Sequence, residues 1–350
     1  MRLTSYLSEC RNLVRDELRT MLPPDTRWTG GLYELMLEYP LRYGKALRPA
    51  LSIAICRALG GCLSAILPTA AVLELYHNAC LVHDDITDHS HQRRGEPTLH
   101  RKHGIPIAVN VGDGMLALVM QPLLENIERV GLGKALRILE IIARMARETA
   151  EGQMIELNWV RSARWDHVDS DYVRLVYKKT AWYSFLAPIM VGAVAAGQAD
   201  LEVRKLGHIT IPLGIAFQIQ DDVLNLSADV HAYGKDSFGD LWEGKHTLIL
   251  IHALRIAPPD DKLAALRILA KSQPDDQANQ SCCECKSHED VRFLRDLIER
   301  CDSIHYARDA AQQYANLFRR RLHAHSKTWP PSVHKDFLYE LADFTVNRTH

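Results

Sequence analysis

Two acidic clusters interrupt mostly apolar, helical sequence, and they are the feature that most limits what this chain can fold into. The first reads DDITD over Asp84–Asp88, and the second reads DDVLN over Asp221–Asn225. An unpaired carboxylate among buried apolar side chains costs several kcal/mol, so such groups are normally paired with a cation. We therefore expect each cluster to face a charged ligand or a metal ion.

Helical spacing sets the geometry of both clusters. Residues four apart lie on one face of a helix, so Asp84 shares a face with Asp88, and Asp221 with Asn225. Two such helices facing each other would form a cup of oxygen atoms, which suits Mg²⁺ bridging to substrate phosphates. Asp85 would support the first cluster. The predicted metal ligands are Asp84, Asp88, Asp221, Asp222 and Asn225.

The rest of the chain also has a helical pattern. Apolar residues recur every three or four positions, as in Leu47, Leu51, Ile55 and Leu59, and alternation of period two is scarce. With 350 residues and 47% hydrophobic content, one large core is possible. We predict an all-α single domain spanning residues 1–350, an antiparallel bundle of about ten to fourteen helices. Residues 337–350 should form a final helix that packs on the body.

Charge and apolar patterning exclude some functions. The formal net charge is −1, without the basic excess of a nucleic-acid-binding protein. Met1–Cys10 does not resemble a secretory signal, and the longest apolar run, Ala187–Gly197, is too short to cross a bilayer. We expect a soluble, cytoplasmic protein with no membrane span and no nucleic-acid partner. The Cys282–Cys285 cluster lacks a second cysteine pair, so a solvated loop is favoured over a zinc site.

Several cations lie near the acidic clusters in sequence. Arg93 and Arg94 follow the first acidic helix, where the chain must turn at Gly95, and guanidinium groups bind phosphate oxygens in pairs. Lys45 and Arg48 flank the start of another helix, which is a suitable position for an anion. Both groups indicate a phosphate-containing substrate.

The ordered motifs resemble a known family. They are GKALRP, LVHDDITD, RRGEPTLH, GQMIEL, KKT, FQIQDDVLN and GKDSFGDLWEGK. In this order the chain resembles a trans-isoprenyl diphosphate synthase of the short-chain type, the group that includes farnesyl and geranylgeranyl diphosphate synthases. The match runs motif by motif from about residue 44 to residue 250.

The resemblance implies a helical bundle around a central cavity, a homodimer, and magnesium-dependent joining of isopentenyl diphosphate to an allylic diphosphate. It also implies three magnesium ions when substrate is bound. Carried over by position, the residues that hold the allylic diphosphate are Arg93, Lys179, Thr180, Gln218, Lys235 and Lys245. Those that hold isopentenyl diphosphate are Lys45, Arg48, His77 and Arg94.

The mechanism follows from these charges. Magnesium and lysines stabilise the leaving diphosphate, the allylic carbocation is attacked by the double bond of isopentenyl diphosphate, and a proton is then lost. A cavity without water protects the cation. The predicted catalytic residues are Asp84, Asp85, Asp88, Asp221, Lys179 and Lys235.

Two alternatives on the same fold remain open. Asn225 stands where the family often has a third aspartate, and the second metal site of related class I terpene cyclases often includes an asparagine. A cyclase, however, has no second diphosphate to bind, and the Lys45/Arg48 and Arg93/Arg94 pairs favour a synthase. A non-catalytic subunit would typically have lost an acidic motif, and here both are present.

The length of the product depends on the floor of the pocket beside the first acidic helix. Ala79 and Cys80, five and four residues before Asp84, are small, whereas family members that stop at C15 carry bulky aromatics there. The tunnel should therefore be deeper by one helical turn, roughly 5 Å, with Tyr76 as the next floor. This favours the C20 product geranylgeranyl diphosphate, with C15 and C25 as alternatives.

Overall fold

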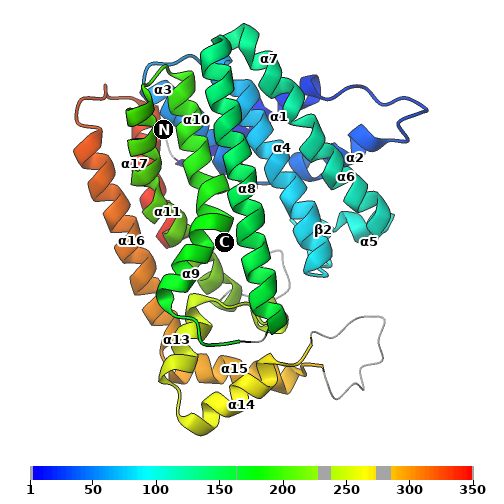
Figure 1. Cartoon of the computed structure of the whole chain (residues 1–350), viewed down its shortest axis with the longest axis vertical. Helices are drawn as coiled ribbons and strands as arrows, with labels where there is room; N and C mark the ends of the chain where they lie inside the picture. The colour runs from blue at the N-terminus through cyan, green and yellow to red at the C-terminus, as the bar shows by residue number, and fades with distance from the viewer. Residues whose placement is uncertain (1–2, 163, 228–237, 273–284, 349–350) are drawn as a thin grey trace.

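The computed structural model describes residues 3–162, 164–227, 238–272 and 285–348, and these are almost entirely helical. The predicted all-α class is confirmed (Figure 1). The elements are α1 (Leu3–Met21), α2 (Leu32–Leu41), α3 (Leu47–Ala58), α4 (Leu63–Thr87), β1 (Gln92–Arg93), β2 (Glu96–Pro97), α5 (Leu99–His103), α6 (Ile105–Leu118), α7 (Met120–Val130), α8 (Leu132–Ser162), α9 (Asp169–Val176), the π-helix η1 (Tyr177–Leu186), α10 (Ala187–Ala195), α11 (Asp200–Ser227), α12 (Gly239–Glu243), α13 (Leu248–Ile256), α14 (Pro259–Leu269), α15 (His288–Arg300), α16 (Ser303–His325) and α17 (Val333–Asn347).

The described residues hold more helices than the sequence predicted, because short helices such as α5 and α12 add to the number and because continuous helical stretches change geometry along their length. α9, η1 and α10 follow one another without a loop. The π-helical turn lies where η1 meets α8: a Cβ added at Gly152 would lie 2.4 Å from the backbone nitrogen of Lys179. Such close backbone packing comes from tertiary structure, and π-helical turns often occur at functional positions.

The two short strands form a hairpin directly after α4. Gln92 pairs with Pro97 and Arg93 with Glu96 in antiparallel register. The two turn residues have positive φ, 56° at Arg94 and 80° at Gly95, as in a type I′ turn. The turn at Gly95 was predicted from the sequence, but the strands were not. The tight turn presents both arginines close to the end of the acidic helix.

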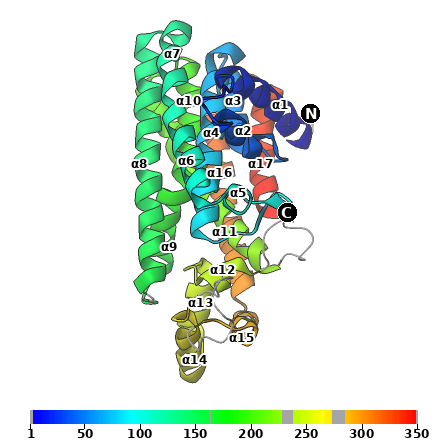
Figure 2. The same ribbon diagram turned by 90° about the vertical axis from the view of Figure 1, so that its right-hand side faces the viewer.

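Two clusters of buried hydrophobic residues form the core. One is built mainly on α3, α4, α8 and α10, and the other on α13, α15 and neighbouring helices. Long helices α11 and α16 contribute to both clusters. Helices α13, α14 and α15 lie together at one end of the molecule (Figures 1 and 2). The predicted final helix is present, since α17 buries Phe337, Leu338 and Leu341 in the first cluster.

Two helices bear on the expectation that the chain has no membrane span. Within the described residues, Leu63–Thr87 and Ile105–Val130 are both long and apolar enough, judged by length and composition alone. Both stretches contain scattered polar residues and are longer than the continuous apolar run Ala187–Gly197, on which the expectation rested. In Leu63–Thr87 the apolar window is 72% buried inside the protein, which is typical of a core helix, whereas in Ile105–Val130 the value is 39%.

Candidate active site

A cavity of about 600 Å³ lies between α3 and α4 on one side and η1 and α11 on the other. Its wall brings together most of the residues that the sequence predicted. These are Lys45, Arg48, His77, Asp84, Asp88, Arg93, Arg94, Lys179, Thr180, Gln218, Asp221, Asp222, Asn225 and Lys245. Lys235 lies outside the described residues. The cavity thus has the composition expected of a site for anionic substrates.

The second aspartate of each acidic pair is held by a buried tyrosine. The Tyr39 hydroxyl donates to Asp85 Oδ2 at 2.7 Å, and the Tyr172 hydroxyl donates to Asp222 Oδ2 at 2.7 Å. The other Asp222 oxygen accepts a hydrogen bond of 2.8 Å from Gln218 Nε2. Both Asp222 oxygens therefore already have protein partners, and this side chain fixes the position of Gln218 beside the cavity.

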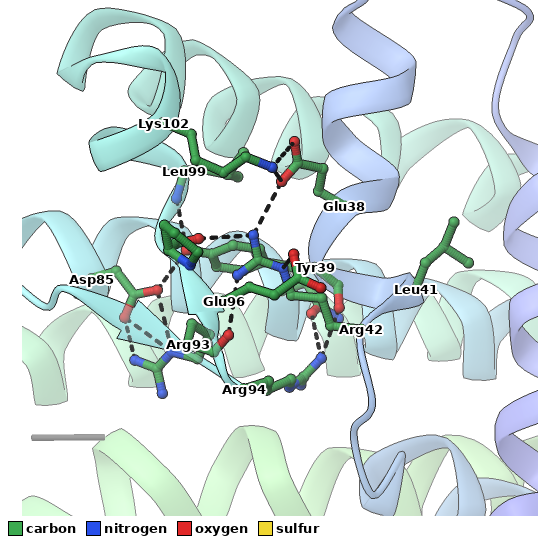
Figure 3. A network of polar contacts seen from close by, with 12 residues as sticks. Glu38, Tyr39, Leu41, Arg42, Asp85, Arg93, Arg94, Glu96, Leu99 and Lys102 are labelled. Carbon is green, nitrogen blue, oxygen red and sulfur yellow. Dashed lines mark hydrogen bonds and ion pairs between the residues drawn. The ribbon is translucent and has the colours of Figure 1, made fainter. Parts of the chain in front are cut away.

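Asp85 also ties the arginine hairpin to α4. Arg93 Nε lies 3.0 Å from Asp85 Oδ1 and 3.2 Å from Oδ2, so the guanidinium and carboxylate are paired (Figure 3). On the other side of the hairpin, buried Arg42 donates to the backbone oxygens of Arg93 and Pro97 at 3.1 and 2.9 Å. The supporting role predicted for Asp85 is consistent with these contacts. Arg42 has no signal in the sequence motifs.

The first aspartate of the α4 pair faces the cavity. The Asp88 backbone nitrogen donates to the Asp84 carbonyl at 2.8 Å, so the two residues stand one turn apart as predicted. Burial raises the pKa of Asp84 above its ordinary value; Lys179 opposes this effect and Asp88 adds to it. A carboxylate in this position would be stabilised further by an added cation.

Two lysines neutralise these acids. Lys179 forms an ion pair with Glu156 of the GQMIEL motif, a residue without a predicted role. Burial would lower the pKa of Lys179, but Glu156 and Asp84 more than offset that effect and raise it. Lys245 Nζ lies 3.5 Å from Asp88 Oδ2 and 2.5 Å from Glu243 Oε2. Both lysines are therefore charged and close to the α4 acids.

The donor set fits a hard cation shared with a substrate. Asp84, Asp88 and Asp221 offer only oxygen atoms to one cavity. Among the described residues, no three acidic, histidine or cysteine side chains converge into a ready-made metal cage. Mg²⁺ is usually bound by one or two carboxylates together with water and substrate phosphates, so an arrangement completed by a diphosphate suits it.

The second acidic motif contacts the C-terminal helix. Arg348, directly after α17, donates to Asp221 Oδ1 at 2.6 Å and to the Phe217 carbonyl at 3.0 Å. This residue was missed, although the tail was expected to pack on the body. On the same motif, Asn225 Oδ1 accepts a hydrogen bond of 3.2 Å from the Asp240 backbone nitrogen, so the amide holds the start of α12.

Lys45 and Arg48 flank the N-terminus of α3, as the sequence predicted. Ala46 is the N-cap in left-handed conformation, with φ of 49° and no side-chain cap. Arg48 donates to Ser184 Oγ at 2.8 Å. Burial, followed by the nearby charge of Arg348, lowers the pKa of Lys45 to about 8. The helix terminus, the half-buried Lys45 and the buried Arg48 together form a seat for an anion.

Arg94 and His77 complete this seat. Arg94 donates to the Tyr39 carbonyl at 2.8 Å, and a Cβ added at Gly44 would lie 2.8 Å from its Cζ atom. Glycine is therefore required at position 44 for the guanidinium to lie there. Burial, followed by the charges of Arg48 and Arg94, lowers the pKa of His77 well below its ordinary value, so the imidazole is neutral.

The three residues predicted as the chain-length floor do not appear in the wall of this cavity. From the same helix, His77 and Leu81 line it, but Tyr76, Ala79 and Cys80 do not. Ala79 is fully buried, and burial raises the pKa of Cys80 to about 12. Their role in limiting product length stays a prediction.

Comparison with known proteins places the chain in a family. A sequence model of polyprenyl synthetase matches residues 31–285. The chain belongs to the polyprenyl synthetase family. As a family member it is a prenyltransferase of isoprenoid synthesis, which confirms the resemblance seen in the motifs.

Individual relatives extend over nearly the whole chain. It is 32% identical over 345 residues to geranylgeranyl diphosphate synthase of Sulfolobus acidocaldarius, covering 98% of each protein. The fold is similar to geranylgeranyl pyrophosphate synthetase from Pyrococcus horikoshii, with TM-score 0.84, 30% identity, and 99% and 98% of the two chains covered. It is also similar to a polyprenyl synthase from Caulobacter crescentus complexed with calcium and isoprenyl diphosphate, with TM-score 0.82, 28% identity, and 99% and 95% covered.

Proposed function

We propose that this prenyltransferase condenses isopentenyl diphosphate with allylic diphosphates to geranylgeranyl diphosphate, using Mg²⁺. One observation carries the proposal: a single cavity holds the acids of α4 and α11 together with a separate cationic seat at the start of α3. The first set suits a metal-bound diphosphate and the second suits another anion. The names of the Sulfolobus and Pyrococcus relatives support the C20 product.

The residues of the cavity are proposed to bind the two substrates as follows. Lys179, Lys245 and Arg93 hold the allylic diphosphate as it leaves, and Lys45 with Arg48 holds isopentenyl diphosphate. Bound at Asp84, Asp88 and Asp221, magnesium would supply further positive charge to the leaving group. Thr180, Gln218 and Lys235 are proposed to assist at the allylic diphosphate, and His77 and Arg94 at the other. The lost proton passes to the departing diphosphate.

A product assay tests this function. Purified protein with Mg²⁺ receives isopentenyl diphosphate and dimethylallyl, geranyl or farnesyl diphosphate, and mass spectrometry sizes the hydrolysed products. A C20 alcohol is the expected result, and chelation by EDTA should abolish it. Elongation to another length would keep the reaction and reject the C20 product. A cyclic product without consumption of isopentenyl diphosphate would instead identify a terpene cyclase.

Product length should respond to side-chain size on α4. Ala79→Phe is expected to shorten the main product to C15, because an aromatic ring would fill about one helical turn of the tunnel. Tyr76→Ala is the opposing variant and should admit C25. Chromatography of the hydrolysed alcohols measures both. An unchanged product from the two variants would show that this face of α4 does not line the tunnel.

We also propose that the protein is a homodimer that forms through α6, α7 and α8. These helices lie along one side of the molecule (Figure 2). They expose large apolar side chains to an extent unusual for a monomer. The residues are Ile105, Ile107, Val109, Met120, Leu124, Ile127, Leu132, Leu136, Met154, Leu157 and Val160. A second copy covering this face would account for the poorly buried Ile105–Val130 segment without a bilayer, in a soluble, cytoplasmic, single-domain protein.

A charge on that surface should separate the subunits. Leu136 is 52% exposed on α8, and Leu136→Asp would bury a carboxylate at the proposed interface, which is costly. Light scattering after gel filtration should show half the mass of the wild type. Leu263→Asp is the matched control, because Leu263 is 51% exposed on α14, away from this face. If wild type and Leu136→Asp had the same mass, or if the wild-type protein sedimented with lipid vesicles, the result would argue against the dimer.

A further inference from the structure

His246 is a buried histidine in the cavity wall whose ring is stacked on a tryptophan. It lies between Lys245 and Thr247, the N-cap residue of α13, and is only 3% exposed. Its ring stacks on Trp165 with centroids 3.7 Å apart and planes 15° apart. The rings of Trp159 and His167 lie at 5.6 and 5.2 Å. Because stacking covers a face of the imidazole, a ligand would meet the ring through its edge, which carries both nitrogens.

Neither ring nitrogen of His246 has a hydrogen-bond partner among the described residues. Burial, followed by the charge of His167, lowers the pKa of His246 to about 3, so the imidazole is neutral. A neutral imidazole still carries one N–H donor and one acceptor nitrogen. Most buried polar groups in native proteins are paired, and leaving one unpaired is unfavourable. An orphaned donor in the wall of a ligand cavity therefore indicates that the ligand supplies the acceptor.

The surroundings identify the kind of acceptor. Lys245, the preceding residue, lines the same cavity, and its charge attracts anions to this end of it. We propose that His246 is a further substrate-binding residue, whose edge N–H donates a hydrogen bond to an oxygen of the diphosphate held beside Lys245. The inference rests on the proposed function, because it names one more contact of that diphosphate. The stack on Trp165 fixes the ring in advance, so little conformational entropy is lost on binding.

The test measures binding of inorganic diphosphate with Mg²⁺ to the full-length protein by calorimetry. His246→Phe keeps an aromatic ring against Trp165 but removes both nitrogens. This variant should raise the dissociation constant for diphosphate by about five- to tenfold, which corresponds to the loss of one hydrogen bond. Its melting temperature without ligand should be unchanged or higher, because buried unpaired nitrogens are lost. His246→Gln, which restores a donor, should recover much of the affinity.

The outcomes separate this inference from the function on which it rests. Wild-type protein that transfers prenyl groups, combined with equal diphosphate affinity in wild type and His246→Phe, would overturn the role of His246 alone. Wild-type protein that binds no diphosphate would overturn both proposals. Weaker binding in His246→Phe with an intact melting temperature supports the contact, because a purely structural histidine would affect stability rather than affinity.

Discussion

Asp84→Ala should lower kcat/KM by about 10³-fold or more, since metal stabilisation of a leaving group contributes several kcal/mol and each 1.4 kcal/mol is tenfold. The half-buried side chain faces the cavity, and its carboxylate stands near that of Asp88. Stability without ligand should change little, because the variant removes a carboxylate that burial disfavours. Thermal stabilisation by Mg²⁺ with diphosphate should disappear. Steady-state kinetics and thermal melts measure the two effects.

The control for this variant is Asp309→Ala. Asp309 lies on α16, outside the proposed dimer helices, with a side chain 62% exposed, and its carboxylate is 3.5 Å from His305 of the same helix. It shares the charge of Asp84 but does not line the cavity. Activity within a factor of about two of wild type is expected for it, as for most exposed substitutions. Asp84→Ala activity within tenfold of wild type would contradict the proposed metal site.

Asp85→Ala should reduce the free energy of unfolding by about 3–5 kcal/mol, the usual cost of breaking a buried ion pair from one side. The carboxylate is fully buried, accepts from Tyr39, and pairs with Arg93. Its removal leaves a guanidinium without its anion and detaches the hairpin from α4. Activity should fall as well, because Arg93 would lose its position at the cavity. Urea denaturation measures the stability change.

Tyr39→Phe is a milder variant at the same contact, because it leaves the ion pair between Asp85 and Arg93 in place. It removes one hydrogen bond to Asp85 and one from the Leu99 backbone nitrogen but keeps the ring. A loss of about 1–3 kcal/mol is expected, the usual range for a buried group left unpaired. If Asp85→Ala were no less stable than Tyr39→Phe, the ion pair with Arg93 would not be what holds the hairpin in place.

The site residues that could be predicted from the sequence were identified by short-range sequence patterns. Helical periodicity places Asp84 and Asp88 on one face, so their common orientation toward the cavity could be predicted from spacing. Lys45 and Arg48 were located by their position at the start of a helix. The order of the motifs then identified the family. Each motif consists of residues within a few positions of one another, although the motifs together extend from about residue 44 to residue 250.

The residues that the sequence missed depend on distant partners. Tyr39 reaches Asp85 across 46 positions, and Arg348 reaches Asp221 across 127. No local pattern marks a tyrosine or arginine for such a contact, because the pairing exists only after the helices pack. The π-helical turn at Lys179 likewise depends on the approach of α8 at Gly152.

The contact between Arg348 and Asp221 has a practical consequence for handling the protein. An affinity tag fused after His350 would begin just beyond a side chain that touches the proposed metal-binding wall, and its charges would compete for the same carboxylate. Histidine tags would add metal-binding groups at that point. Kinetic and metal-affinity measurements therefore call for a tag at the other end of the chain, where α1 packs against α3 and α4 in the first hydrophobic cluster.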